Sequence, residues 1–299
     1  MIRIILILLL THCLISPAWA AAAEWTDALG RVVQVDEQPQ RIVSLVPSVT
    51  EILFALGLGD RVVGVTEFCT YPSAALSKAR AGGYGSPNLE AVVGLMPDLV
   101  LTSADATSPA FVSRLESLGI PTYVVYPRSL ADTSAMIKNI GRVTGALEQA
   151  EKQAQCLDQT VAAVRDAVAG LSRPRTLVAV MLQPLIVAGP ETLANDLLQT
   201  VGAENVVPQS PGRYPSWNPE AVLAADPDVL MVSQHSVEVN PGELFAGWSA
   251  LKAVRENRVV SIDPDLILRP GPRLALGLAA MARAVHGLEV QIQETSCPE

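Results

Sequence analysis

Asn88-Leu-Glu-Ala-Val-Val-Gly-Leu-Met-Pro-Asp98 recurs 130 positions later as Asn218-Pro-Glu-Ala-Val-Leu-Ala-Ala-Asp-Pro-Asp228. In both copies the Asn is a favoured helix cap, and a Glu follows in the first turn, where the helix dipole favours an anion. Each helix should end before Pro-Asp, because the residue that precedes a proline is driven out of the helical region. Apolar runs at 99–101 and 229–232 come next, as is typical of buried parallel strands. The sequence therefore predicts the same helix–strand unit twice.

The flanking sequence extends this pattern in both halves of the chain. Before the first copy, residues 41–46 and 61–65 have the composition of buried strands, and 51–58 between them is predicted to be an amphipathic helix. Before the second copy, a strand is predicted at 176–181 and a helix at 190–201. Strands that alternate with helices form βαβ units and parallel sheets. Two such sets predict an α/β protein with two lobes.

A long helix is predicted between the two halves. From Ala146 to Leu171 the apolar residues recur every three or four positions, and no Pro or Gly occurs before Gly170. At about 1.5 Å per residue, a helix of this length spans about 40 Å, the width of a small domain. We interpret 147–171 as a rigid bridge between an N-terminal lobe, 24–146, and a C-terminal lobe, 172–299. The alternative is one more surface helix of a single large domain.

The first twenty residues, 1–20, have the pattern of a cleavable secretory signal peptide. Arg3 supplies a positive charge, residues 4–10 are apolar, and Ala18 and Ala20 are the small residues that a signal peptidase reads. We place the cleavage position within Ala20–Ala23 and expect an exported protein. Cys13 leaves a lipid anchor as the alternative.

Charge and cysteine content limit the partners of the mature chain. The full chain has a net charge of -9 and a pI of about 4.9, and removal of Arg3 with the signal peptide makes the mature chain more negative. No run of Lys or Arg occurs, so we expect no nucleic-acid partner. In an oxidising compartment, Cys69, Cys156 and Cys297 allow one disulfide and one free thiol, and the pairing stays open. His235 and His286 lie near no Cys, Asp or Glu at ligand spacing, so no metal site is predicted.

Aromatic residues are only 4% of the chain, yet five of them fall in loops rich in Pro and Gly. They are Phe68, Tyr71, Tyr84, Tyr214 and Trp217. Exposed loop aromatics are unfavourable unless something covers them, and flat rings suit a flat ligand. The alternative is that each ring packs under its own loop, which we favour for Tyr71, whereas we favour ligand contact for Tyr84 and Tyr214.

One stretch identifies a family resemblance. Arg41-Ile-Val-Ser-Leu-Val-Pro-Ser-Val-Thr-Glu-Ile-Leu-Phe-Ala-Leu-Gly57, together with 61–65 and Tyr71-Pro72, resembles the periplasmic binding proteins of iron-complex and cobalamin importers. The resemblance runs from about Arg41 to about Val285. It implies two Rossmann-like lobes joined by one long bridging helix, limited hinge motion, a periplasmic location and a ligand held in the cleft between the lobes. The partners it implies are a membrane permease and its ATPase, and we expect the chain to be a monomer.

Within that family, the loops 68–72, 83–90, 214–220 and 265–269 are most similar to those of vitamin B12-binding members. The resemblance makes Phe68, Tyr84, Tyr214 and Trp217 ligand-contact candidates, the first three as aromatic walls. It also makes Asp265 and Arg269 polar contacts to corrin amides. The chain departs from the family pattern at Ile186 and Leu266, where large aromatic residues are usual. Cobalamin is therefore the expected ligand, with the exact corrinoid open.

Alternatives to the corrinoid assignment come from the same residues. Haem is the second candidate, with Tyr84 as an axial oxygen ligand. Ferric siderophores are third, because anionic ligands usually require several arginines, and the chain supplies mainly Arg269, with Arg213 and Arg273 as further candidates. We expect that Asp265 and Arg269 are not a helical pair, since prolines surround them. A mutual salt bridge holding their loop is the alternative to ligand contact.

Glu90 and Glu220 occupy the same place in the two copies of the repeat. They could be simple favourable charges at helix N-termini. The resemblance implies more, because in this importer family a glutamate at this spot in each lobe docks onto arginines of the permease. We therefore predict that both residues contact the permease.

An enzyme is the main competing class, since Rossmann-like lobes also carry oxidoreductases. The chain has no Gly-x-Gly-x-x-Gly after a first strand, no phosphate-binding Gly-Lys-Ser/Thr and no Gly-x-Ser-x-Gly elbow. No paired carboxylates accompany a histidine. We therefore predict a binding protein with no catalytic residues and no resident cofactor.

Overall fold

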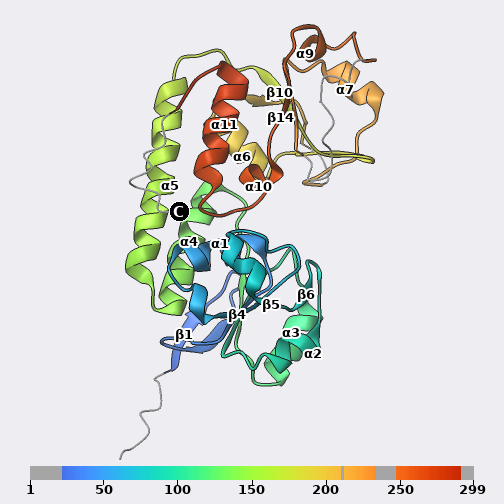
Figure 1. Ribbon diagram of the computed structural model, residues 1–299. Coiled ribbons are helices and arrows are strands. Elements are labelled where there is room, and N and C mark those ends of the chain that lie inside the picture. Colours follow the sequence, from blue (N-terminus) through green and yellow to red (C-terminus); the bar gives the residue numbers. More distant parts are fainter. Residues whose placement is uncertain (1–21, 210–211, 234–246, 291–299) are drawn as a thin grey trace, which may run out of the picture.

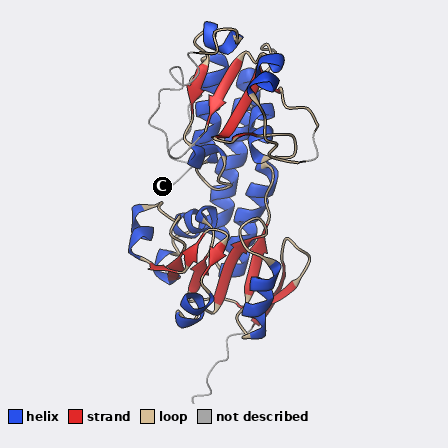
Figure 2. Ribbon diagram, turned by 90° about the vertical axis from the view of Figure 1, so that its right-hand side faces the viewer, coloured by secondary structure: helices blue, strands red, loops and turns tan. Residues whose placement is uncertain are grey.

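The computed structural model describes residues 22–209, 212–233 and 247–290 (Figure 1). The predicted signal peptide, His235 and Cys297 lie outside these ranges. Two α/β lobes, each with its own sheet, are stacked along a pair of long helices (Figures 1 and 2). This confirms the predicted fold class. None of the helices in the described ranges is long and apolar enough to cross a membrane.

The first lobe is built on a five-stranded parallel sheet, preceded by an antiparallel hairpin. In sheet order, the strands are β5 (Ala79–Arg80), β4 (Val62–Val65), β3 (Ile42–Ser44), β8 (Leu99–Ser103) and β9 (Thr122–Val125). The hairpins are β1 (Ala22–Thr26) with β2 (Val32–Asp36), and β6 (Gly82–Gly83) with β7 (Ser86–Pro87). The helices are α1 (Pro47–Ala55), α2 (Leu89–Gly94) and α3 (Pro109–Ser117). Short 3-10 turns lie at Gly59–Arg61 and Ser73–Ser77.

The second lobe repeats this plan with one antiparallel edge strand. In sheet order, the strands are β11 (Leu185–Val187), β10 (Arg175–Leu182), β13 (Val229–Val232) and β14 (Val259–Ser261), and β12 (Glu204–Asn205) also pairs with β10. The helices are α6 (Leu193–Thr200), α7 (Pro219–Ala225), α9 (Lys252–Arg255), α10 (Pro264–Ile267) and α11 (Leu274–His286). The β10–β11 hairpin is an element that the sequence pattern did not predict.

The internal repeat has the same structural role in both lobes. The Asn88 and Asn218 side chains accept the hydrogen bonds that cap α2 and α7, as predicted. After each helix, an Asp carboxylate ties the next strand to the one beside it. Asp98 accepts from the backbone N–H of Arg41 at 2.9 Å, and Asp228 accepts from that of Arg175 at 2.8 Å. The repeated Pro-Asp therefore fixes the register at which the central strands begin.

The predicted bridging helix is α5 (Leu147–Val168), which runs along both lobes (Figure 1). It packs against α4 (Leu130–Thr144) of the first lobe and against α6 and α11 of the second. The helix ends three residues before the predicted 171. The sequence pattern did not single out α4, which packs along α5 and also touches α6 of the second lobe.

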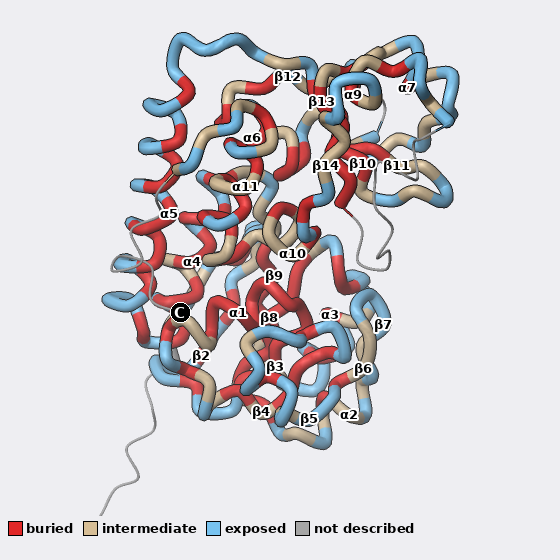
Figure 3. The backbone as a smooth tube through the Cα atoms, turned by 45° about the horizontal axis from the view of Figure 1, so that its top comes forward, coloured by how far each residue is buried: buried red, intermediate tan, exposed pale blue. Residues whose placement is uncertain are grey.

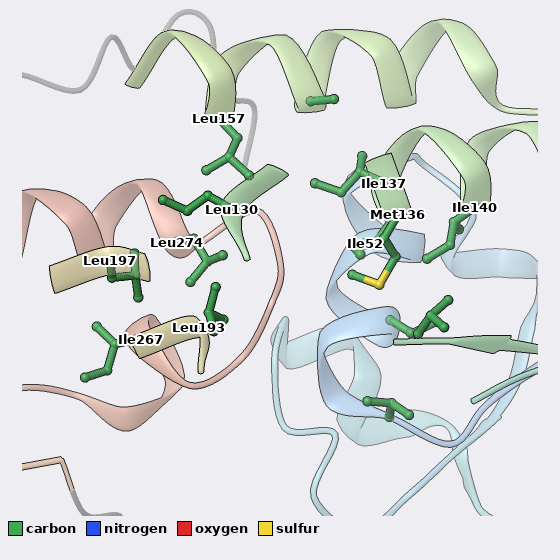
Figure 4. Close-up of a cluster of buried hydrophobic side chains, with 14 of the residues drawn as sticks. Ile52, Leu130, Met136, Ile137, Ile140, Leu157, Leu193, Leu197, Ile267 and Leu274 are labelled. Atoms are coloured by element: carbon green, nitrogen blue, oxygen red, sulfur yellow. The ribbon is translucent and has the colours of Figure 1, made fainter. Parts of the chain in front are cut away.

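The hydrophobic core continues from one lobe into the other. Along the central strands, alternate side chains enter either this shared core or a cluster on the opposite face of the sheet, because neighbours on a strand point to opposite faces. Figure 4 shows members of the shared core along α4 and α5. Those that it labels are Ile52, Met136, Ile137 and Ile140 towards the first lobe, and Leu130, Leu157, Leu193, Leu197, Ile267 and Leu274 towards the second. In Figure 3 buried stretches lie in both lobes and recur along α4 and α5.

Candidate inter-lobe binding site

The residues between the lobes come from loops and helices that follow the carboxyl ends of parallel strands. In the first lobe, α1 follows β3, and Asp105 follows β8. In the second, α10 and the segment that leads into α11 follow β14. Arg213 of the second lobe follows β12. Ion pairs join Asp105 to Arg213, and Glu51 of α1 to the segment that leads into α11. The two sheets therefore turn their carboxyl-terminal edges toward each other, which is where open α/β sheets bind ligands.

Tyr84 and Tyr214, the predicted ring walls, come from opposite lobes and lie beside one ion pair. The side chain of Arg213 donates to Asp105 across the lobes, with Nη2 and Oδ1 2.8 Å apart. The tyrosines are 45% and 43% exposed, so each leaves much of its surface open to a partner. We call these four residues the tyrosine group.

The placement of the tyrosine group also affects the pKa of each phenol. Burial raises the pKa of Tyr84, and the charge of Asp105 adds to the rise. Burial also raises the pKa of Tyr214. Arg213 acts in the opposite direction, and Asp105 and Tyr84 reinforce the rise. Both phenols are therefore held in their neutral, hydrogen-bonding form.

Tyr126 orders the cation of the tyrosine group, although sequence reasoning missed it. The guanidinium of Arg213 lies 5.5 Å from the centre of the Tyr126 ring, and that of Arg128 lies 5.6 Å from the same ring. Cations are attracted to an aromatic face at such distances. Tyr126 follows directly after β9, and this position at a strand's carboxyl end was the signal available in the sequence.

A second ionic contact joins the lobes through Glu51 of α1. The Glu51 side chain is 2% exposed, and Arg273 of the second lobe holds it in a fork, with Nε to Oε2 at 2.9 Å and Nη2 to Oε1 at 2.6 Å. Arg269 Nη1 lies 3.5 Å from Oε1 of the same carboxylate. Burial lowers the pKa of Arg273, but the hydrogen bond and charge of Glu51 outweigh this effect and raise it.

The predicted polar contacts Asp265 and Arg269 belong to this same group. Arg269 Nε lies 2.9 Å from Asp265 Oδ1, and Arg273 Nη2 lies 3.5 Å from Asp265 Oδ2. We call these four residues the Glu51 network. Its two carboxylates and two guanidinium groups cancel in charge. Sequence reasoning missed Glu51, although a carboxylate among the buried residues of α1 requires a partner.

Asp265 and Arg269 form the mutual salt bridge that was the alternative to ligand contact, and of the two only Asp265 lies within a helix. Residues 264–267 form the one-turn helix α10, and the two side chains pair four positions apart. Pro264 stands at the first helical position, where its missing N–H is no loss, and Pro270 comes only after the helix has ended. The prolines therefore bound the turn instead of preventing it.

The other aromatic candidates have different surroundings. Phe68 is 54% exposed and lies near Gly83, next to Tyr84 in sequence. Trp217 is partly buried against the hydrophobic cluster on the far face of the second sheet. Tyr71 does not only pack under its own loop, because the guanidinium of Arg273 lies 4.1 Å from its ring centre. Phe68 is therefore the open aromatic next to the tyrosine group.

Glu90 and Glu220 lie in the first turns of α2 and α7 and are exposed. No hydrogen bond or ion pair to another described residue holds either carboxylate. Because Asn88 and Asn218 already cap these helices, neither glutamate is needed to satisfy the helix N-terminus. Both are available to a partner.

Of the cysteines, Cys69 is free and fully buried, with its sulfur 3.1 Å from Thr50 Oγ1 and 3.2 Å from Thr66 Oγ1. Cys156 is disulfide-bonded. Cys69 is therefore not its partner, and the predicted alternative Cys297 lies outside the described residues. Within the ranges that the structure describes, no group of three or more His, Cys, Asp or Glu residues could hold a metal ion.

The family model described as "Periplasmic binding protein" matches residues 42–266. The chain belongs to this family. A cobalamin-binding protein of Halobacterium salinarum is 32% identical to it over 276 residues, which cover 88% of this chain and 74% of that protein. The family resemblance predicted from residues 41–57 is thereby confirmed.

Two solved structures have the same fold. The periplasmic vitamin B12-binding protein BtuF of Vibrio cholerae superposes with a TM-score of 0.77 at 26% identity, covering 85% of this chain and 99% of that one. The periplasmic haem-binding protein BhuT, in complex with two haems, superposes with a TM-score of 0.75 at 30% identity, covering 82% and 97%. The chain resembles a vitamin B12-binding and a haem-binding structure to a similar degree, so the choice between these ligands depends on the chain's own residues.

Proposed function

We propose that this periplasmic binding protein captures cobalamin or a related corrinoid between its lobes and delivers it to the permease of an ABC importer. Membership of the family makes the chain a substrate-binding protein for corrinoids, haem or other iron complexes. Its relatives are solute-binding proteins rather than enzymes. The corrinoid is the finer assignment, and it depends on the chemistry of the inter-lobe groups.

The observation that carries the proposal is the charge balance between the lobes. The Glu51 network has two negative and two positive groups, and Asp105 balances Arg213. Arg269 and Arg273 are therefore already neutralised, and they attract an anion weakly while keeping N–H groups that can donate to an amide oxygen. With half-exposed tyrosine rings alongside, this surface suits a large, flat ligand rich in carboxamides and without net negative charge.

The same contacts speak against the two alternatives. An anionic siderophore would need several free cations, and carboxylates pair with all three arginines considered from the sequence. Arg128, beside the Tyr126 ring, is a further cation near this surface. Haem would need Tyr84 as a phenolate ligand to iron. Burial and the neighbouring Asp105 raise the pKa of Tyr84, so forming that phenolate is less favourable than in water.

Titration of the purified mature protein with cyanocobalamin, and separately with haemin, tests the ligand. We expect calorimetry to show cyanocobalamin binding, and Tyr214→Ala to weaken it by about tenfold or more, because an aromatic wall is lost. Tyr84→Phe keeps the ring and should retain most of the corrinoid affinity. If cyanocobalamin gives no heat, and haemin binds with a spectrum that Tyr84→Phe changes, the ligand is haem instead.

The exposed glutamates support the proposed delivery step. One free carboxylate per lobe, at equivalent positions, provides two-point recognition of cationic side chains on the permease. We expect the double variant Glu90→Ala/Glu220→Ala to bind ligand normally and to lose uptake. Glu151→Ala, which removes an exposed carboxylate from α5, is the control and should leave uptake unchanged. Normal uptake by the double variant would remove this assignment.

A further inference from the structure

The Asp105–Arg213 pair combines fixed backbones with open side chains. Around Asp105, the backbone N–H groups of Ala104 and Ala106 donate to Val125 and Ser103, both at 3.0 Å. On the other lobe, the carbonyl of Arg213 accepts from Gly189 at 2.8 Å, so its loop is tied to the chain just after β11. The two side chains are 43% and 28% exposed. The charges thus stand at fixed positions on opposite lobes, with solvent access to the bond between them.

An ion pair of this kind is readily exchanged for a ligand. Half-exposed pairs contribute little to stability, because water screens them and both side chains lose freedom by pairing. The Glu51 network differs, since its carboxylate is almost fully covered. Of the two ionic contacts that the described residues form between the lobes, the Asp105–Arg213 pair is therefore the one that a ligand could enter without unfolding part of the protein.

A carboxamide is the group that matches both halves of this pair. Guanidinium only donates hydrogen bonds and carboxylate only accepts them, whereas a primary amide has an accepting oxygen and a donating NH₂. Placed between the two side chains, the amide oxygen accepts from Arg213 and the amide NH₂ donates to Asp105. A carboxylate of the same shape would also accept from Arg213 but would meet the like charge of Asp105, which is unfavourable.

We propose that Asp105 and Arg213 are specificity-determining residues that select a ligand side-chain carboxamide against a carboxylate of the same shape. The inference rests on the proposed function, because it concerns how the protein recognises the side-chain amides of a corrinoid. Tyr126 positions the guanidinium, and the two half-exposed tyrosines on either lobe place a ring-shaped ligand beside the pair. Neither residue of the pair was among the ligand contacts that the family resemblance implies.

The test compares cyanocobalamin with derivatives in which one side-chain amide has been hydrolysed to the acid. Dissociation constants are measured for wild type, Asp105→Asn and Arg213→Gln. Glu289→Gln is the matched control, since it breaks an exposed ion pair with Arg283 of α11. We expect wild type to prefer the amide over at least one of the acids by about tenfold, as like-charge contacts are strongly disfavoured. In Asp105→Asn this preference should fall to within about twofold, because the repelling charge is gone.

Arg213→Gln should weaken amide and acid alike, and Glu289→Gln should change neither. If Asp105→Asn leaves the amide-to-acid ratio as it is in wild type, the inference is wrong while the proposed ligand stands. If wild type fails to bind cyanocobalamin, the proposed function itself is wrong and the inference falls with it. Thermal unfolding of each variant, expected to stay within about 4 °C of wild type, shows that the changes arise at the site.

Discussion

Among the residues that the structure describes, two ionic contacts join the lobes, and they differ chiefly in their access to water. In the Glu51 network, the carboxylate is 2% exposed and both arginines are 15% exposed. In the Asp105–Arg213 pair, the side chains are 43% and 28% exposed. Removing a buried charge's partner is strongly unfavourable, whereas an exposed pair contributes at most about 1 kcal/mol. The same guanidinium–carboxylate chemistry therefore fixes the lobes in one place and leaves an exchangeable contact in the other.

The surroundings of the two contacts reinforce this difference. Arg273 forms a fork with Glu51 and also stacks on Tyr71, so its position is fixed by groups from the other lobe. The Glu51 network also lies on α1 and beside α11, which both contribute to the continuous core. Arg213 has one hydrogen bond to Asp105 and a more distant ring. The comparison therefore predicts that substitutions in the Glu51 network lower the stability of the protein, whereas substitutions in the Asp105–Arg213 pair change its ligand selectivity.

The largest expected effect is on stability. Glu51→Gln keeps the shape of the side chain but leaves Arg269 and Arg273 buried, with Asp265 as their one carboxylate partner among the described residues. We expect a loss of about 3 kcal/mol in the free energy of unfolding, measured by urea denaturation. Asp105→Asn, the matched change in the exposed pair, should lose less than about 1 kcal/mol. Equal losses in the two variants would contradict the distinction between the contacts.

A smaller effect is expected when salt is added, on the interaction energy between the two charged side chains of each contact. Double-mutant cycles on Asp105 with Arg213, and on Glu51 with Arg273, measure each pairwise term separately. Raising the salt from 0.1 M to 1 M shortens the screening length from about 10 Å to about 3 Å, and this acts on exposed charges far more than on buried ones. We expect the Asp105–Arg213 coupling, about 0.5 kcal/mol at low salt, to fall toward zero. The Glu51–Arg273 coupling should keep most of its value, and a parallel decline of both would show that water reaches Glu51.

Much of the fold could be predicted because the signals that specify it are local. The Asn caps, the Pro-Asp stops and the apolar runs of the repeat each act within a few residues, and the strand at 229–232 was placed at its observed bounds. The three-to-four spacing located α5 for the same reason. Helix α4, by contrast, was not singled out, and the β10–β11 hairpin was missed.

The site was harder to predict because the side chains that pair with one another there are far apart in the sequence. Asp105 and Arg213 are 108 positions apart, and Glu51 and Arg273 are 222 apart. No local pattern encodes such pairs. A single residue can still show that a partner must exist: Glu51 sits among buried residues of α1, and a buried carboxylate without a cation would be very unfavourable. That argument predicts a positive partner but not which arginine supplies it.

The smallest expected effect is a change in overall shape on ligand binding. The core runs unbroken through α4, α5, α6 and α11, and the Glu51 network closes a second connection between the lobes. A packed core does not deform continuously, so the lobes have little freedom to rotate, and a ligand needs only to open the exposed pair. X-ray scattering profiles with and without cyanocobalamin should therefore superimpose within error. Glu51→Gln, with one connection weakened, should show the larger change on binding. A marked fall in the wild-type radius of gyration would mean that the lobes close as hinged bodies and that neither the core nor the Glu51 network fixes their relative position.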